Sequence, residues 1–305
     1  MIKLNFKVPI SNIVFIITIF IVPISCEKED SPNIPFGYDP NFNYLEVLRS
    51  SPDYAFELTE GYIAFTYQES NDTSLIQLKN QFNLDSVAGE GNELDRIFNL
   101  FNWAHKQIRH DGNNSTPGPE NSIAILQHVK ETGRGVNCVM MAIVLNEVYL
   151  SMGIKSRVIQ GNARKFIFNG DWHSFNIVYS ETLNKWIFLD LTMKAFFKDD
   201  KGNFLSVSEV RDHLIMGKEL NLNPEADYNS EPVDEDDYLN YLSKNLYRFS
   251  CSVDSRFGNY EIFHLCNPPG RIYYHLDPGG DKQDGLGLAV NFFTSNPDFF
   301  WAKPY

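Results

Sequence analysis

A long apolar segment, Val139 to Met152, follows directly on a glycine-rich turn that runs from Gly133 to Cys138. Its length and its lack of a polar face favour a buried helix over a strand. Gly153 comes where a left-handed residue would end such a helix. We therefore expect Cys138 at the N-terminus of a helix that lies inside the protein and that the rest of the chain must cover.

The segments on either side of this helix differ in their periodicity. Residues 93–108 place apolar side chains at three- and four-residue steps, which predicts an amphipathic helix. After the buried helix, segments 157–159, 174–179 and 185–189 are typical of strands, the last two joined as a hairpin. Aromatic-rich segments beyond Tyr247 predict further strands.

The position of Cys138 favours reactivity. A thiol at a helix N-terminus faces unpaired backbone N–H groups and the positive end of the helix dipole, and both favour the thiolate. The same N–H groups can stabilise an oxyanion on an attacked carbonyl. Cys138 is therefore a candidate nucleophile, although its position alone leaves a buried, inert thiol as the alternative.

Two polar residues bound the predicted hairpin. His173 precedes its first strand and Asp190 follows its second strand. If the strands pair, the carboxylate of Asp190 fixes the tautomer of His173 and stabilises its imidazolium form, while the other ring nitrogen faces the thiol. An acid at the end of an apolar strand needs a partner. A turn-capping role for Asp190 near Thr192 is the alternative.

Four pieces of the sequence, in this order, resemble the transglutaminase-like superfamily. They are the turn Gly133–Cys138, the segment Gly153-Ile154-Lys155-Ser156-Arg157-Val158 with Gly161, the strand His173-Ser174-Phe175-Asn176, and the strand Trp186-Ile187-Phe188-Leu189-Asp190 with Thr192. The resemblance covers roughly residues 90 to 200. It implies an α+β fold of the papain and transglutaminase type, with the nucleophile at a helix N-terminus packed on an antiparallel sheet, plus a small C-terminal β-rich region.

The resemblance also implies a chemistry. Cys138, His173 and Asp190 would form a catalytic triad that acts on peptide or protein amide bonds through an acyl-enzyme, with no cofactor and no metal. Hydrolysis is favoured over transamidation, because water is always present and no amine site is evident. Animal cross-linking relatives carry a Trp that helps the oxyanion hole; the stretch 120–123 has none, so the second oxyanion donor is unassigned. The alternative is a non-catalytic surface binding module on the same fold.

Other candidate residues carry weaker signals. Trp172, beside His173, is a candidate for lining the acyl pocket, with core packing as the alternative. Cys251 and Cys266 are expected either to form a disulfide in an oxidising compartment or to stay buried as free thiols. No Cys/His spacing is of the zinc type. His105 and His110 flank a helix end and are interpreted as surface histidines. Four other histidines have no carboxylate or cysteine pattern around them: His128, His213, His264 and His275.

The amino terminus has the pattern of an export signal. Lys3 and Lys7 precede an apolar run over 13–22 that is too short to span a bilayer but suits a secretory signal. Pro23-Ile24-Ser25-Cys26 then resembles a bacterial lipoprotein cleavage site, and acidic residues follow at once. We expect an exported outer-membrane lipoprotein, on the periplasmic or cell-surface side, held to the membrane only by a lipid on Cys26. The alternative is an ordinary secretory leader that is cleaved nearby.

Charge and composition set limits on partners and domains. The formal net charge is −13 and no Lys/Arg cluster reverses it locally, which argues against nucleic acid as a partner. The oligomeric state is not indicated. The predicted organisation is a signal peptide (1–25), a tether (26–45), a transglutaminase-like domain (46–222), an acidic linker or loop (223–238) and a C-terminal β-rich region (239–305).

Overall fold

The computed structural model describes residues 38–56, 64–164, 172–256, 262–265 and 291–305, and for 262–265 and 291–293 it describes the backbone alone. The predicted signal, Cys26 and most of the tether lie outside these residues, as do Cys266 and residues 165–171.

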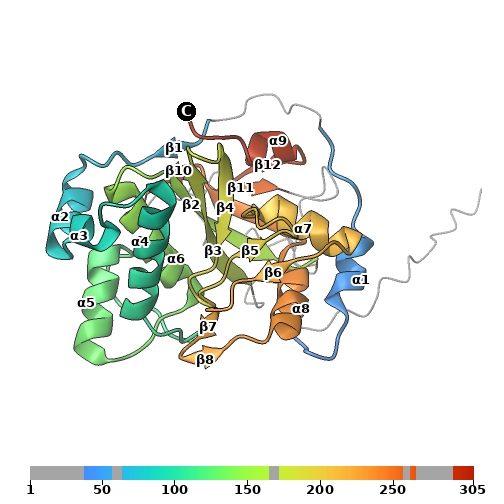
Figure 1. Cartoon of the computed structure of the whole chain (residues 1–305), viewed down its shortest axis with the longest axis horizontal. Coiled ribbons are helices and arrows are strands. Elements are labelled where there is room, and N and C mark those ends of the chain that lie inside the picture. Colours follow the sequence, from blue (N-terminus) through green and yellow to red (C-terminus); the bar gives the residue numbers. More distant parts are fainter. Residues whose placement is uncertain (1–37, 57–63, 165–171, 257–261, 266–290) are drawn as a thin grey trace, which may run out of the picture. The chain divides into compact units, whose positions relative to one another are not determined.

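A six-stranded sheet lies at the centre of the described residues (Figure 1). Strands β9, β2, β3 and β4 are antiparallel neighbours; β11 is antiparallel to β9, and β12 lies parallel to β11. The order across the sheet is β12 (Asn291–Thr294), β11 (Ile262–Leu265), β9 (Arg248–Ser252), β2 (Ser156–Asn162), β3 (His173–Ser180) and β4 (Lys185–Leu189). The predicted hairpin is confirmed, since β3 and β4 pair from Asn176 with Leu189 to Ser180 with Lys185.

Alternation along the central strands gives the sheet two apolar faces. Ile177 and Phe188 belong to one buried cluster, whereas the neighbouring residues Val178 and Ile187 belong to another. Successive side chains of a strand point to opposite faces, so both faces of β3 and β4 need a cover. Helices provide it on each side.

The first face carries the buried helix that the sequence predicts. α6 (Cys138–Ser151) is apolar all round because it lies between the sheet and an outer set of helices, all contributing to one core. Gly153 follows its C-cap with a φ of 75°, as expected for a left-handed residue. The outer helices are α2 (Thr73–Gln81), α3 (Leu84–Ala88), α4 (Glu93–Gln107) and α5 (Ser122–Thr132).

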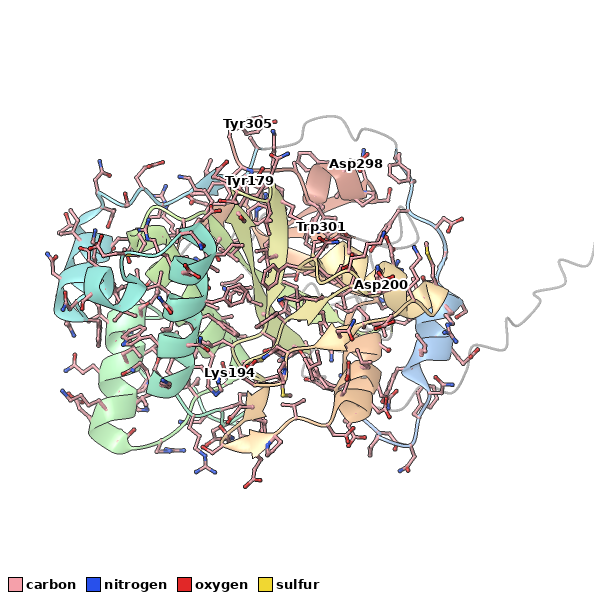
Figure 2. All side chains as sticks on the ribbon, viewed as in Figure 1. Tyr179, Lys194, Asp200, Asp298, Trp301 and Tyr305 are labelled. Carbon is pink, nitrogen blue, oxygen red and sulfur yellow. The ribbon has the colours of Figure 1, made fainter. Side chains whose placement is uncertain are left out.

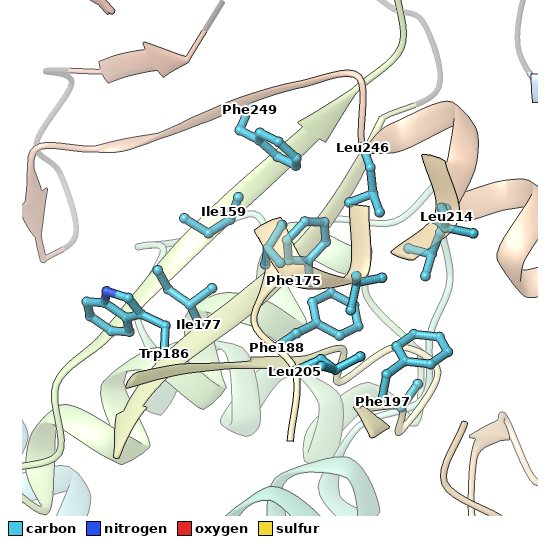
Figure 3. Packing of buried hydrophobic residues seen from close by; sticks show 14 of the residues in the cluster. Ile159, Phe175, Ile177, Trp186, Phe188, Phe197, Leu205, Leu214, Leu246 and Phe249 are labelled. Carbon is cyan, nitrogen blue, oxygen red and sulfur yellow. The ribbon is translucent and has the colours of Figure 1, made fainter. Parts of the chain in front are cut away.

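The second face is rich in aromatic residues. Figure 3 shows Phe175, Phe188 and Phe249 from the sheet packed with Phe197 and Leu214 from the elements that cover it. These covering helices are α1 (Tyr44–Arg49), α7 (Val207–Met216), α8 (Glu235–Asn245) and α9 (Pro297–Phe300). Short strand pairs accompany them: β1 (Thr66–Tyr67) with β10 (Asp254–Ser255), β5 (Phe197–Lys198) with β6 (Asn221–Leu222), and β7 (Asp227–Tyr228) with β8 (Glu231–Pro232).

The acidic segment 223–238, expected to be a linker or a surface loop, includes some regular structure. It contains the β7–β8 hairpin and the first turn of α8, whose N-cap Asp234 accepts a hydrogen bond from the backbone N–H of Asp237 at 3.0 Å. Acidic side chains in the first turn suit the positive end of the helix dipole. The C-terminal strand β9 pairs with β2 in the main sheet, from Ile159 with Cys251 onward, so the C-terminal region extends the core.

A close backbone approach holds α8 against the sheet. A Cβ atom at Gly161 in β2 would lie 2.5 Å from the carbonyl oxygen of Asn245, the last residue of α8. Only glycine leaves room for this contact. The contact fixes the position of α8 next to the strands that begin at His173 and end before Asp190.

The C-terminal segment is fastened to the sheet by Arg157. The buried guanidinium donates hydrogen bonds to the carbonyls of Phe300 and Ala302 at 2.7 and 2.8 Å. The indole N–H of Trp186 donates to the carbonyl of Trp301 at 3.1 Å, and Figure 2 labels Trp301 beside α9. Arg157, from the Gly-Ile-x-x-Arg-Val segment, therefore has a structural role in this chain.

Candidate active site

Cys138 is the first residue of α6 and is half-buried. The residue before it, Asn137, caps the helix by accepting a hydrogen bond from the backbone N–H of Met140 at 3.0 Å. The backbone N–H groups of the first helical turn have no partner within the helix, and they carry the positive end of the helix dipole. The thiol therefore lies where the sequence places it, at a helix end that favours negative charge.

His173 and Asp190 meet across the end of the β3–β4 hairpin. His173 is the first residue of β3, and Asp190 directly follows the last residue of β4. The Nε2 atom of His173 lies 2.5 Å from the Oδ2 atom of Asp190, and both side chains are buried. The strand pairing thus joins two residues that are 17 positions apart in the sequence.

Asp190 is fully buried but well supplied with donors. Its Oδ2 atom also accepts a hydrogen bond from the hydroxyl of Tyr238 at 2.7 Å. Its Oδ1 atom accepts from the backbone N–H groups of Thr192 and Met193, at 2.9 and 3.3 Å. Burial alone would raise the pKa of Asp190, but the positive charge of His173 and these donors lower it. The carboxylate is therefore charged at neutral pH, and the turn contacts accompany the bond to His173.

The negative charge of Asp190 shifts the pKa of His173, and the positive charge of His173 in turn shifts the pKa of Cys138. Burial alone would lower the pKa of His173, but the charge of Asp190 and its hydrogen bond raise that pKa to about 10, with a smaller contribution from Cys138. Burial alone would raise the pKa of Cys138. Hydrogen bonds from His110 and His173, and the positive charge of His173, lower it to about 6. The favoured state at neutral pH is a thiolate beside an imidazolium.

Sequence reasoning misses two residues of the site. Tyr238 lies on α8 and binds Asp190, although the acidic run before it favours a solvated linker. A signal is present, since Tyr238, Leu242 and Leu246 recur at four-residue steps and are all buried. His110, for which the sequence favours a surface role, bridges to Val136 beside the nucleophile turn and lowers the pKa of the Cys138 thiol. No local sequence pattern around His110 predicts that it lies beside the nucleophile turn.

The remaining predicted residues lie apart from these contacts or outside the described part of the chain. Trp172 is half-buried directly before β3, and its role in a pocket stays a prediction. Cys251 is a buried free thiol, whereas its predicted partner Cys266 lies outside the described residues, so their disulfide stays a prediction.

The other histidines differ in their surroundings. His105 bonds to Asp227 at 3.2 Å, and His213 to the carbonyl of Glu219 at 2.8 Å. His128 is partly buried, and its Nε2 atom makes no hydrogen bond. The side chains of His264 and His275 lie outside the described residues.

The described residues contain neither a metal-binding cluster nor a membrane-spanning helix. No group of three or more His, Cys, Asp or Glu side chains in this part of the chain is arranged to hold a metal ion. None of its helices is long and apolar enough to cross a membrane.

Comparison with known families gives a match over the region that carries the triad. Residues 80–191 match the family model of the transglutaminase-like superfamily. This segment of the chain is similar to a transglutaminase-like domain. The mixed helix and sheet architecture agrees with the predicted α+β class. Tyr238 and the C-terminal strands lie outside the matched residues.

Similar solved structures are remote. One is described as a "putative cysteine protease" from Cytophaga hutchinsonii; the likeness has 14% identity and a TM-score of 0.30, and covers 53% of this chain and 55% of that one. Another is red sea bream transglutaminase, with 15% identity, a TM-score of 0.30, and 68% of this chain against 38% of that one. The chain thus spans about half or less of each of these proteins. A search of curated proteins finds no match.

The pKa values predict the pH dependence of Cys138 labelling. The thiolate forms as pH rises through about 6, and the imidazolium persists to about 10, so labelling of Cys138 by iodoacetamide should rise near pH 6 and stay level up to that limit. Labelling is measured peptide by peptide by mass spectrometry. Burial raises the pKa of Cys251 to about 12, so Cys251 should remain unlabelled at neutral pH.

The unfolded chain provides the reference for this titration. In urea, Cys138 should label with the midpoint of a free thiol, roughly 8.5. A midpoint near that value in the folded protein would show that the thiol is not paired with His173, and would contradict the charge arrangement described above.

Proposed function

We propose that this protein is an exported cysteine enzyme that cleaves amide bonds of peptides or proteins through a thioester intermediate. The observation that carries the proposal is a thiol at a helix N-terminus, Cys138, whose pKa is lowered by His173, the buried partner of Asp190. A residue kept only for packing needs neither a lowered pKa nor a charged partner. Thiolates activated in this way are typical nucleophiles of acyl transfer.

The first half of the proposed reaction forms the acyl-enzyme. The Cys138 thiolate attacks the carbonyl carbon of the amide, and the carbonyl oxygen takes the negative charge. Backbone N–H groups at the start of α6 stabilise this oxyanion. The imidazolium of His173 then gives its proton to the departing amine as the C–N bond breaks. A thioester on Cys138 and a neutral His173 remain.

The second half releases the product. Neutral His173 takes a proton from a water molecule, whose oxygen attacks the thioester carbonyl. Collapse of the second oxyanion breaks the C–S bond and frees the carboxylic acid. The thiolate and the imidazolium are restored. Throughout, Asp190 keeps the imidazole oriented and stabilises its positive charge, and Tyr238 holds Asp190 in place.

The choice between water and an amine as the second substrate decides the class of product. We favour water, because it is always present and the sequence shows no evident amine site. Incubation of the protein with a peptide library, with and without a primary amine, should give mainly hydrolysed peptides in both cases. Amine adducts in excess of hydrolysed products would make the protein a transamidase.

Cys138→Ala is the matched control in this experiment. It should lose all product formation with either second substrate, since the thioester cannot form. If the alanine variant keeps the biological effect of the protein, then binding on this fold, and not catalysis, is its function.

The proposed location rests on the sequence pattern around Cys26. We propose a lipid on this cysteine that holds the domain at the outer membrane. In cells grown with radiolabelled palmitate, the full chain should become labelled and should sediment with the membranes. Cys26→Ser should lose both the label and the membrane association. An unlabelled wild-type protein, or a serine variant that still sediments with membranes, would contradict the anchor.

A further inference from the structure

The loop that carries His110 is joined to the nucleophile turn by its backbone. His110 forms a parallel bridge with Val136, the N–H of Asp111 donates to the carbonyl of Val136 at 2.8 Å, and the N–H of Val136 donates to the carbonyl of Arg109 at 3.0 Å. A Cβ atom at Gly135 would lie 2.5 Å from the carbonyl oxygen of Arg109, so only glycine permits this approach. The glycine turn thus fixes His110 near Cys138.

The β7–β8 hairpin fixes His110 from the other side. The side chain of Asn229 accepts a hydrogen bond from the backbone N–H of His110 at 2.8 Å and donates one to its carbonyl at 3.0 Å. Asn229 has a positive φ of 56°, which asparagine tolerates better than most residues. Two reciprocal bonds from one side chain leave the backbone of His110 little freedom.

The hairpin also determines which ring nitrogen of His110 is available. The Nδ1 atom lies 3.0 Å from the hydroxyl oxygen of Tyr228. If that hydroxyl donates to Nδ1, the proton of the neutral ring is on Nε2. The Nε2–H group is then the donor left for the oxygen of a carbonyl whose carbon is bonded to Cys138.

The surroundings of His110 favour a role as a hydrogen-bond donor to an oxyanion over a role as a general base. Among the described residues no carboxylate forms an ion pair with His110, whereas His173 has Asp190. The imidazolium of a general base at His110 would therefore lack the support that His173 receives. A neutral N–H donor needs no such support.

We propose that His110 is a catalytic residue that donates the second hydrogen bond to the oxyanion, and that Tyr228 is the positioning residue that sets its tautomer. The proposal rests on the proposed function, since it concerns the oxygen of the carbonyl that Cys138 attacks. The first donor is the backbone at the start of α6. His110 thus supplies the second oxyanion donor, for which the stretch 120–123 has no Trp.

Two reactions of the Cys138 thiolate distinguish stabilisation of an oxyanion by His110 from an effect of His110 on the reactivity of the sulfur itself. Alkylation by iodoacetamide forms no oxyanion, whereas acylation by p-nitrophenyl acetate passes through one. Both rates are measured on the full chain at pH 8, above the Cys138 pKa of about 6. The quantity compared is the ratio of the acylation rate to the alkylation rate, because a change in thiolate content alone cancels from this ratio.

His110→Ala should lower the ratio about 10²- to 10³-fold, the usual effect of removing one oxyanion donor. His110→Gln keeps an N–H donor and should restore most of it. Tyr228→Phe, which removes one oxygen atom, should lower the ratio about tenfold, because the tautomer is no longer set. His128→Gln is the matched control, since His128 makes no hydrogen bond at Nε2 and is not in the site; it should leave the ratio unchanged.

The outcomes distinguish the two proposals. An unaltered ratio in His110→Ala and Tyr228→Phe, or an equal fall of both rates, would overturn the role of His110 while leaving the enzyme in place. If the wild-type thiol is not acylated at all, the proposed function itself fails. Should His110→Ala not fold, as judged by circular dichroism, Tyr228→Phe decides the matter, since it removes one oxygen atom and is expected to lower the ratio.

Discussion

The contact between His173 and Asp190, 2.5 Å long and closed off from water, is the interaction on which the site depends. Two ionised groups in the interior are stable only with further hydrogen bonds, and Asp190 receives these from Tyr238 and from the backbone after β4. Both groups therefore keep their charges, and the charge on His173 lowers the pKa of Cys138.

The fold brings the side chains of the site together from three separate layers. α6 supplies the thiol from one face of the sheet, the β3–β4 hairpin supplies the imidazole and the carboxylate, and α8 supplies Tyr238 from the other face. The alternation of Ile177, Val178, Ile187 and Phe188 gives the sheet two apolar faces and makes this three-layer arrangement stable. A one-residue slip between β3 and β4 would turn the wrong side chains inward.

The sequence predicts the parts of this arrangement that rest on local patterns. The apolar run after Cys138 predicts α6, and the hairpin period predicts that His173 and Asp190 meet. Tyr238 escapes prediction because the acidic residues before it suggest solvent, and because its partner is 48 positions away. His110 escapes it for a different reason: its contact depends on the pairing of two loops through Gly135, which no periodicity records.

In this arrangement His173 holds Cys138 as a thiolate. The far-ultraviolet absorbance of the thiolate, taken as the difference between the wild type and Cys138→Ala at neutral pH, measures this directly. The same difference is then taken in a His173→Gln background. We expect a full thiolate signal with His173 present and almost none in the glutamine background, since the thiol pKa then rises toward that of a free thiol, roughly 8.5. An equal signal in both backgrounds, or no signal in the wild type, would contradict this arrangement.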